Sequence, residues 1–161
     1  MRIATLGVLA LLLAPPAQAL PFRGLVVEGR SLGGVRLGVR PQAVIKKWGR
    51  THAVCRSCRF RTWYFNYVRF KPQGLGVVFS GGRVVALFTH WSPTGWHTAT
   101  GLRMGDPEHR AMQLYPRLTR HSCGKYDVLV HAKGSGRTQF YVYDGKVWGL
   151  GVSRAWVPPC R

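Results

Sequence analysis

Acidic residues are scarce in this chain of 161 residues, which has 5 Asp and Glu against 24 Lys and Arg. Catalysis by paired carboxylates needs two such groups in one site, and Asp106, Glu108 and Asp144 already have explanations as helix-capping or turn residues. The composition therefore argues against a glycoside hydrolase. The chain also has no nucleophile elbow, phosphate loop or H-E-x-x-H motif. We predict that it is not an enzyme.

Long hydrophobic runs are also missing beyond the first residues. The run from Ile3 to Ala14 is shorter than the roughly 20 apolar residues of a transmembrane helix, and arginines and glycines interrupt every later run. Arg2 precedes this run, and Ala17-Gln18-Ala19 follows it as an A-x-A-like cleavage site. We therefore expect residues 1–19 to be a secretory signal peptide and the rest to be exported, with no transmembrane segment.

The exported part would carry an extreme positive charge. Removal of residues 1–19 leaves 161 − 19 = 142 residues, and their formal net charge is 23 − 5 = +18 because Arg2 is removed. Such a field attracts polyanions, including nucleic acid, acidic cell-wall polymers and anionic lipid head groups. The basic residues are spread through the chain, however, and arginine-rich usage also follows from GC-rich coding. The alternative is a charge of purely compositional origin.

The chain has only four cysteines, which in an exported protein of this size indicate two disulfides. We favour Cys55–Cys58 with Cys123–Cys160, and either crossed pairing is the alternative. His52 and His121 lie close to these cysteines, and both residue types bind zinc. A second C-x-x-C is missing and the compartment is oxidising, so we expect disulfides, with no metal and no cofactor.

One phrase occurs twice in the sequence. Gly34–Gly38 reads GVRLG, Gly101–Gly105 reads GLRMG, and a stretch of helical character begins near a proline after each of them. Duplication on this scale indicates repeated structural units. With the offset of 101 − 34 = 67 residues, the apolar stripes of the two stretches coincide. The matched positions are Val44, Ile45 and Trp48 with Ala111, Met112 and Tyr115. Asp106 is the expected N-cap of the second helix.

Three segments of strand character follow each predicted helix, separated by turn residues such as Gly81-Gly82 and Asp144-Gly145. They are 60–70, 75–79 and 84–91 in the first half, and 126–131, 138–143 and 146–152 in the second. We predict an α+β fold of two tandem α-β-β-β repeats that form a curved antiparallel sheet with two short helices on one face. The expected parts are a leader (20–33) that adds an edge strand at Leu25–Val27, repeat 1 (34–91), a linker (92–100), and repeat 2 with a C-terminal tail (101–161).

The combination of a G-[VL]-R-[LM]-G phrase, a short helix that ends in an aromatic residue, and a meander with G-[RK]-V in its last turn resembles a known repeat. It is similar to the repeat of β-lactamase-inhibitor-protein-like domains and of the related small outer-membrane lipoproteins that assist barrel assembly. The resemblance covers residues 31–152 and implies helices on the convex side of the sheet and a protein-binding concave face. No inhibitor loop matches residue by residue, so the resemblance transfers no binding residue. Inhibition of a β-lactamase or another enzyme is one alternative function.

Aromatic side chains and arginines alternate along the first predicted strand and would share one of its faces. These residue types are enriched at binding hot spots. The candidate binding residues on this strand are Arg61, Trp63, Phe65, Tyr67 and Arg69, and those that could extend the surface are Trp91, Trp96, Tyr141, Tyr143 and Trp148. The alternative is that this face packs under the helices, because the opposite face, with Phe60, Tyr64, Val68 and Phe70, is equally apolar.

We therefore predict an exported, monomeric, non-enzymatic interaction module that binds a protein or an acidic envelope polymer through this aromatic and arginine-rich face. One alternative is a basic secreted nuclease, for which two histidines would act as catalysts. The candidates for that role are His90, His97, His121 and His131. A structural protein of the cell envelope is a further alternative.

Overall fold

Eight strands form one antiparallel sheet with the order β4-β5-β6-β7-β12-β11-β10-β9. The computed structural model describes residues 23–65, 74–90 and 95–160. The first half contributes β4 (Ala53–Cys55), β5 (Arg61–Phe65), β6 (Gly74–Ser80) and β7 (Arg83–His90). The second half contributes β9 (Thr119–Ser122), β10 (Asp127–Lys133), β11 (Gly136–Tyr143) and β12 (Lys146–Arg154). Each half is an antiparallel meander, and the antiparallel pairing of β7 with β12 joins the two in the middle.

The six long strands lie within or overlap the predicted segments, although residues 66–70 of the first segment lie outside the described residues. Each half also has a fourth strand that was not predicted. These additional strands, β4 and β9, are short, largely exposed and at the two edges of the sheet. Because these edge segments are largely exposed, they need no apolar face, and they lack the alternation of apolar and polar residues by which a strand is recognised in a sequence. The three-strand count per half is therefore corrected to four.

Two short helices precede the meanders, α1 (Pro41–Trp48) and α2 (Glu108–Leu114). Each packs most of its predicted stripe on the sheet, with Val44 and Trp48 buried from α1, and Ala111 and the following Tyr115 buried from α2. Met112 was predicted in the stripe of α2, but it is 50% exposed and does not belong to it. The predicted N-cap is wrong. Pro107 is the N-cap of α2, and the Asp106 carboxylate instead accepts a hydrogen bond of 2.8 Å from the Arg103 backbone N–H in the turn before it.

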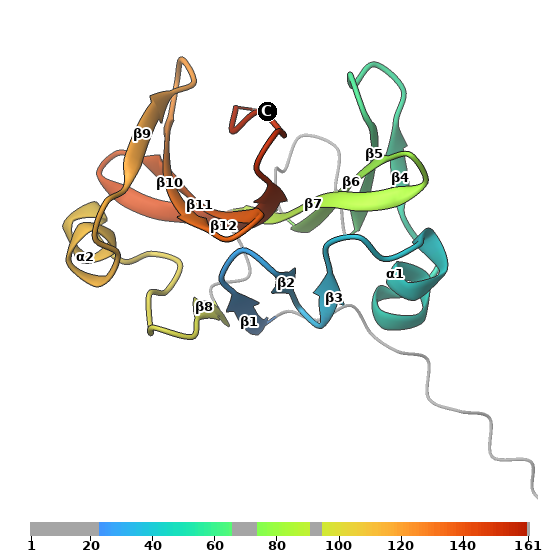
Figure 1. Ribbon diagram of the computed structural model, residues 1–161, viewed down its shortest axis with the longest axis horizontal. Coiled ribbons are helices and arrows are strands. Elements are labelled where there is room, and N and C mark those ends of the chain that lie inside the picture. The colour runs from blue at the N-terminus through green and yellow to red at the C-terminus, as the bar shows by residue number, and fades with distance from the viewer. Residues whose placement is uncertain (1–22, 66–73, 91–94, 161) are drawn as a thin grey trace, which may run out of the picture.

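A second, smaller sheet has the order β3-β2-β1-β8. Its strands are β1 (Arg23–Val27), β2 (Ser31–Leu32), β3 (Val35–Arg36) and β8 (Gly95–Thr98). The leader therefore does not extend the large sheet, and the expected linker contains a strand. Figure 1 shows the small sheet and both helices below the large sheet, whose two ends rise on either side of the C-terminal segment. The helices lie on the convex side, and the C-terminal segment lies on the concave side.

The doubled glycine phrase connects each helix to the last turn of its own meander. The Gly38 N–H donates to Val84 O and the Gly105 N–H donates to Val147 O, both at 2.7 Å. In return, the Val84 N–H donates to Val39 O and the Val147 N–H to Asp106 O, both at 2.9 Å. Both glycines have positive φ, 86° and 93°. The phrase and the G-[RK]-V turn therefore occur together because they are hydrogen-bonded to each other.

The two faces of the large sheet carry separate apolar clusters. The convex cluster joins the sheet to both helices and to the small sheet, and includes Trp48, Trp63, Phe65, Trp96 and Leu150. The concave cluster contains Val78, Phe88, Val128, Tyr141 and, from the C-terminal segment, Val157. Alternate residues of each strand therefore enter different clusters, and both sides of this sheet are apolar.

Both disulfides form as predicted, Cys55–Cys58 and Cys123–Cys160, with Cα–Cα distances of 5.6 and 5.3 Å. The second one attaches the C-terminal segment beside β9. No helix in residues 23–65, 74–90 or 95–160 has the length and hydrophobicity needed to cross a bilayer. The predicted signal peptide lies outside the described residues.

Candidate binding face

The predicted binding face of β5 lies against α1, inside the convex cluster. Trp63 is 3% exposed and Phe65 is 1% exposed. The Phe65 ring packs edge-on against Trp48 at 5.4 Å, and the Trp63 ring packs against Phe79 at 4.6 Å. Their assignment as binding residues is therefore wrong, and the alternative, that this face packs under the helices, describes the structure.

The other predicted binding residues are dispersed. Arg61 is exposed, with its guanidinium carbon 5.2 Å from the Trp63 ring centroid. Trp96 is fully buried in the small sheet on the convex side, so its assignment is also wrong. Tyr141 and Trp148 belong to the concave cluster, with Tyr141 fully buried and Trp148 partly exposed, and Tyr143 is 47% exposed. Tyr67, Arg69 and Trp91 lie outside the described residues.

A row of aromatic rings crosses the concave face from β5 to Tyr126, the residue before β10. Phe88 lies 6.1 Å from Tyr64 and 4.8 Å from His90, measured between ring centroids. The row continues from His90 to Trp148 at 4.7 Å and from Trp148 to Tyr126 at 5.6 Å. Tyr64, Tyr126 and Trp148 are partly exposed. This row spans the junction of the two halves.

Glycines make room for these rings. A Cβ on Gly76, which pairs with Phe88 across β6 and β7, would lie 2.0 Å from the Phe88 ring. A Cβ on Gly151 in the central strand β12 would lie 3.2 Å from the Tyr141 ring. The aromatic rings therefore lie directly on the backbone of neighbouring strands, which fixes their positions on the concave face.

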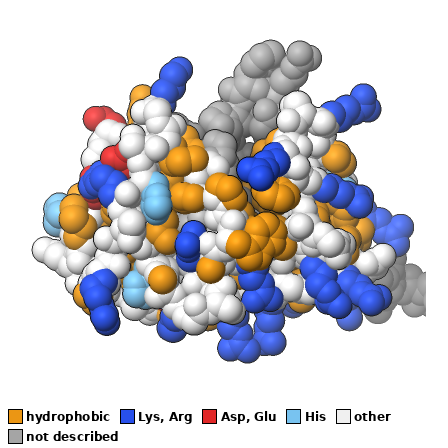
Figure 2. Space-filling model, turned by 45° about the horizontal axis from the view of Figure 1, so that its top comes forward, with side chains coloured by type: hydrophobic (Ala, Val, Ile, Leu, Met, Phe, Trp, Pro, Cys, Tyr) orange, Lys and Arg blue, Asp and Glu red, His pale blue; other side chains and the backbone are white. Residues whose placement is uncertain are grey.

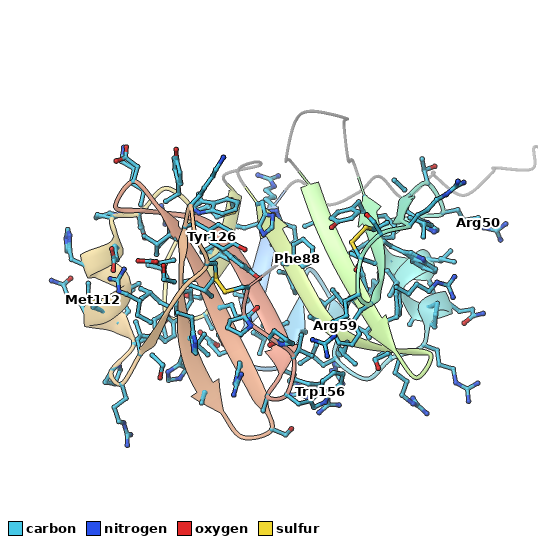
Figure 3. The ribbon with its side chains drawn as sticks, turned by 90° about the horizontal axis from the view of Figure 1, so that it is seen from above. Arg50, Arg59, Phe88, Met112, Tyr126 and Trp156 are labelled. Carbon is cyan, nitrogen blue, oxygen red and sulfur yellow. A yellow bond between two sulfur atoms is a disulfide. The ribbon has the colours of Figure 1, made fainter. Side chains whose placement is uncertain are left out.

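A pocket of about 340 Å³ opens on this face between the two disulfides. Its residues come from the loop after the first disulfide, from β5 to β7, and from the C-terminal segment. The lining residues are Cys58, Arg59, Phe60, Thr62, Tyr64, Val78, Phe88, Val157, Pro158 and Cys160. Figure 3 shows Phe88, Arg59 and Trp156 over the middle of the sheet, while Met112 and Arg50 lie at opposite ends. The pocket is therefore formed by the side of β5 that carries Tyr64, together with the preceding Phe60, and not by the side with Trp63 and Phe65.

Charge is distributed unevenly over the molecule. The ion pairs among the described residues all lie in the second half, joining Arg110 to Asp106 at 3.4 Å, and Arg120 to both Glu108 and Asp127. Figure 2 shows the acidic side chains of this view gathered at the α2 end, whereas Lys and Arg side chains are scattered over the whole view. In the first half the only carboxylate of the sequence is Glu28.

Glu28 is buried, with 8% of its surface exposed, and takes part in a hydrogen-bond network on the convex side. The Tyr115 hydroxyl donates to Glu28 Oε1 at 3.0 Å, and the Thr100 hydroxyl donates to the Tyr115 oxygen. Burial, together with the hydrogen bond and negative charge of Glu28, raises the pKa of Tyr115 to about 12, although hydrogen bonds from Thr100 and Thr98 oppose this shift. The sequence did not reveal this network, because its members are far apart in the chain.

The histidines considered for catalysis lie on four different strands. His90 ends β7 on the concave face and His97 is on β8 of the small sheet. His121 is on the edge strand β9, and His131 on β10 packs on Tyr115 at 5.2 Å between ring centroids. Across residues 23–65, 74–90 and 95–160, no three His, Cys, Asp or Glu side chains are grouped so that they could hold a metal ion. His52 stacks on Trp63 at 4.0 Å, and all four cysteines are in disulfides.

Comparison with known proteins shows similarity of fold alone. No protein-family model matches the chain, and no curated protein matches it either. The structure is similar to an extracellular protein containing an SCP domain from Bacillus anthracis, with a TM-score of 0.52 and 11% identity over 74% of this chain and 44% of that one. The chain thus spans less than half of that protein. An uncharacterized Escherichia coli protein, YfeY, aligns with a TM-score of 0.45 and 11% identity over 84% of this chain and 99% of its own.

Proposed function

We propose that this protein is an extracytoplasmic, non-enzymatic binding module that contacts a partner protein through the concave face of its large sheet. The observation that carries the proposal is the row of aromatic rings, in which Tyr64, Tyr126 and Trp148 are partly exposed, on a sheet face that neither helix covers. Aromatic side chains bury much area at little entropic cost and are enriched in protein interfaces. Two disulfides fit an oxidising compartment outside the cytoplasm.

The binding surface in this proposal differs from the one expected from the sequence. It uses the concave residues Tyr64, Tyr126 and Trp148, together with the exposed Tyr143 and Trp156, instead of the buried pair on β5. These side chains come from both halves of the chain, so the surface is complete only when the two meanders pair. The buried rings of Phe88 and Tyr141 lie on glycine backbone and contact Tyr64 and Trp148, respectively, which favours a preorganised surface.

We also propose that the two halves are tandem repeats related to those of β-lactamase-inhibitor-protein-like domains. The matched hydrogen bonds of Gly38 and Gly105 support this relationship, as does the order of one helix followed by an antiparallel meander in each half. Inhibition of an enzyme would be one form of protein binding by the concave face. The proposal assigns no inhibitory residue.

Site-specific photo-cross-linking tests the proposed surface. A photoreactive phenylalanine analogue replaces Tyr126 on the concave face or, as the control, Met112, which is 50% exposed on α2. We expect a saturable cross-linked species in the exported fraction of the producing cell from position 126 and none from position 112. Equal cross-linking from both positions, or none from position 126 and also none from position 64, would exclude this face as the interface.

The charge of the first half supports a second candidate, binding to an acidic envelope polymer. Residues 20–105 contain one carboxylate, Glu28, and it is buried and hydrogen-bonded to Tyr115. The surface of this half therefore has no negative side chain to offset its lysines and arginines. Polymer binding of this kind falls steeply with salt concentration and is insensitive to Tyr126→Ala. Protein binding by the concave face should instead depend little on salt concentration and should be weakened by Tyr126→Ala. One salt series with that variant therefore separates the two candidates.

A further inference from the structure

We propose that the pocket between the two disulfides binds a small anionic amphiphile, a medium-chain acyl carboxylate, with its chain in the pocket and its carboxylate on Arg59. This ligand site shares Tyr64 with the protein-binding surface proposed above, but it takes a ligand of a different class. It requires no partner protein and can be tested with purified protein alone.

The walls of the pocket favour an apolar chain. Phe60, Tyr64 and Phe88 provide aromatic surface, and Val78, Val157 and Pro158 provide aliphatic surface. A volume of about 340 Å³ lies in the range of about 300–1,000 Å³ that is usual for small-molecule sites. A flexible acyl chain can follow the curved surface between the sheet and the C-terminal segment, and burying it there removes apolar area from water.

The charge at the pocket favours a negative head group. Arg59 is the charged residue among those that line it, and its guanidinium carbon lies 5.5 Å from the Phe60 ring centroid. Among the described residues no carboxylate forms an ion pair with Arg59, and none of the five Asp and Glu lines the pocket. A ligand carboxylate can therefore accept two hydrogen bonds from this guanidinium without competition from an Asp or Glu side chain.

The two disulfides hold the walls in place. Cys58 belongs to one disulfide and Cys160 to the other, and both line the pocket. The Cys123–Cys160 bond attaches the C-terminal segment, and Val157 of that segment is 3% exposed. Two parts of the chain that are about a hundred residues apart are thus fixed on opposite sides of one cavity, which lowers the entropic cost of binding.

Isothermal titration calorimetry with two matched probes tests the proposal. Decanoate and decylammonium have chains of similar length and opposite charge, and both are used below the concentration at which they aggregate. We expect decanoate to bind with one-to-one stoichiometry and decylammonium to bind at least about tenfold more weakly. Equal binding of the two probes, or no heat from decanoate, would overturn the proposal.

Two variants in the pocket and two control variants locate the site. Arg59→Gln should weaken decanoate binding by about tenfold and remove the preference for the anion. Pro158→Trp places a large side chain at the exposed rim and should abolish binding, whereas Met112→Trp, on exposed α2, should leave it unchanged. Arg50→Gln is the control for loss of charge alone.

If Pro158→Trp folds, as judged by its circular dichroism, and still binds decanoate as tightly as the unmodified protein, the ligand does not bind in this pocket. Failure of the cross-linking experiment would not affect these results.

Discussion

Glu28 is the most buried of the five acidic side chains, and Tyr115 supplies the hydrogen bond that makes this burial possible. A carboxylate removed from water without a donor would cost several kcal/mol. The network connects the residue after β1 to the residue that follows α2, so it fastens the small sheet to the end of α2. Its role is structural, and it accounts for one of the two carboxylates that have no capping or turn role; the other, Asp127, pairs with Arg120.

Replacement of Tyr115 by Phe should therefore destabilise the protein although it removes only one oxygen atom. We expect a loss of about 1–3 kcal/mol in the free energy of unfolding, because the carboxylate of Glu28 stays buried without its donor. Urea denaturation measures this change. Tyr143→Phe, at a position that is 47% exposed, is the control and should change the stability by less than about 0.5 kcal/mol. Equal effects of the two substitutions would contradict the structural role.

The same hydroxyl makes the stability dependent on alkaline pH. The pKa of Tyr115 is raised to about 12 in the folded protein, against 10.0 for an ordinary tyrosine. The unfolded chain therefore loses this proton first, so the contribution of Tyr115 to stability is fully present below pH 10 and is lost as the pH rises towards 12. We expect the unfolding midpoint to fall more steeply above pH 10 in the unmodified protein than in Tyr115→Phe. Parallel curves would show that Tyr115 has an ordinary pKa.

The residues of β5 show where prediction from the sequence stops. The alternation of Arg61, Trp63 and Phe65 correctly identifies residues that share a face, because the period of two is a local property of strands. Phe60 and Tyr64 are as apolar as Trp63 and Phe65, so composition could not decide which set faces the helices. That choice depends on α1, which brings Trp48 onto Phe65, and on the C-terminal segment, which brings Val157 to the other side.

At the level of elements, the two glycine phrases should contribute similarly to stability. Gly38 and Gly105 have φ of 86° and 93°, a conformation that alanine adopts only with strain. A Cβ on Gly105 meets nothing within 4 Å, and one on Gly38 meets only the end of the flexible Arg154 side chain. We therefore expect Gly38→Ala and Gly105→Ala each to lower the free energy of unfolding by about 1–3 kcal/mol, measured by urea denaturation.

Ala43→Gly in α1, at a position with no such φ constraint, is the control and should lower the free energy of unfolding by about 1 kcal/mol or less. A neutral substitution at only one of the two glycines would show that the phrases are not equivalent.

The two disulfides should contribute unequally. The Cys123–Cys160 bond has a sequence separation of 37 residues and the Cys55–Cys58 bond a separation of 3. By the entropy of loop closure, the first is worth about 4 kcal/mol and the second about 2 kcal/mol. We expect the double variant Cys123→Ser/Cys160→Ser to lose more stability than Cys55→Ser/Cys58→Ser, measured by urea denaturation. The reverse order would mean that the C-terminal segment adds little to the fold.

The elements that the sequence predicts are those with a local signature. The strands β6, β7, β11 and β12 are bounded by glycine turns, and the helices carry an apolar stripe. The small sheet has neither signal, because β2 and β3 are two residues long and β8 lies in a segment rich in turn-forming residues. It exists because Trp96 packs against Gly24 and Gly33, an arrangement that forms only after the chain has folded back.

At the level of the whole molecule, the two halves share a single convex core. One cluster contains Val44 and Leu87 from the first half, Ala111 and Leu150 from the second, and Leu32 from the small sheet. The central pairing of β7 with β12 continues the hydrogen-bonded sheet across the boundary between the halves. Neither half can therefore bury its apolar face alone.

A substitution in the second half should consequently destabilise the first half to the same extent. Leu150 is fully buried in β12, and Leu150→Ala should lower the free energy of unfolding by about 2–5 kcal/mol. Native-state hydrogen exchange measures protection strand by strand, and we expect the most protected amides of β6 and β11 to lose protection equally. Met112→Ala, on exposed α2, should change the protection of neither strand.

If β6 kept its protection while β11 lost it, the halves would unfold separately. A binding face built from both halves could then be lost while the first half stays folded. Equal loss means that the concave face exists only while the whole chain is folded, because its aromatic rings lie on strands of both halves.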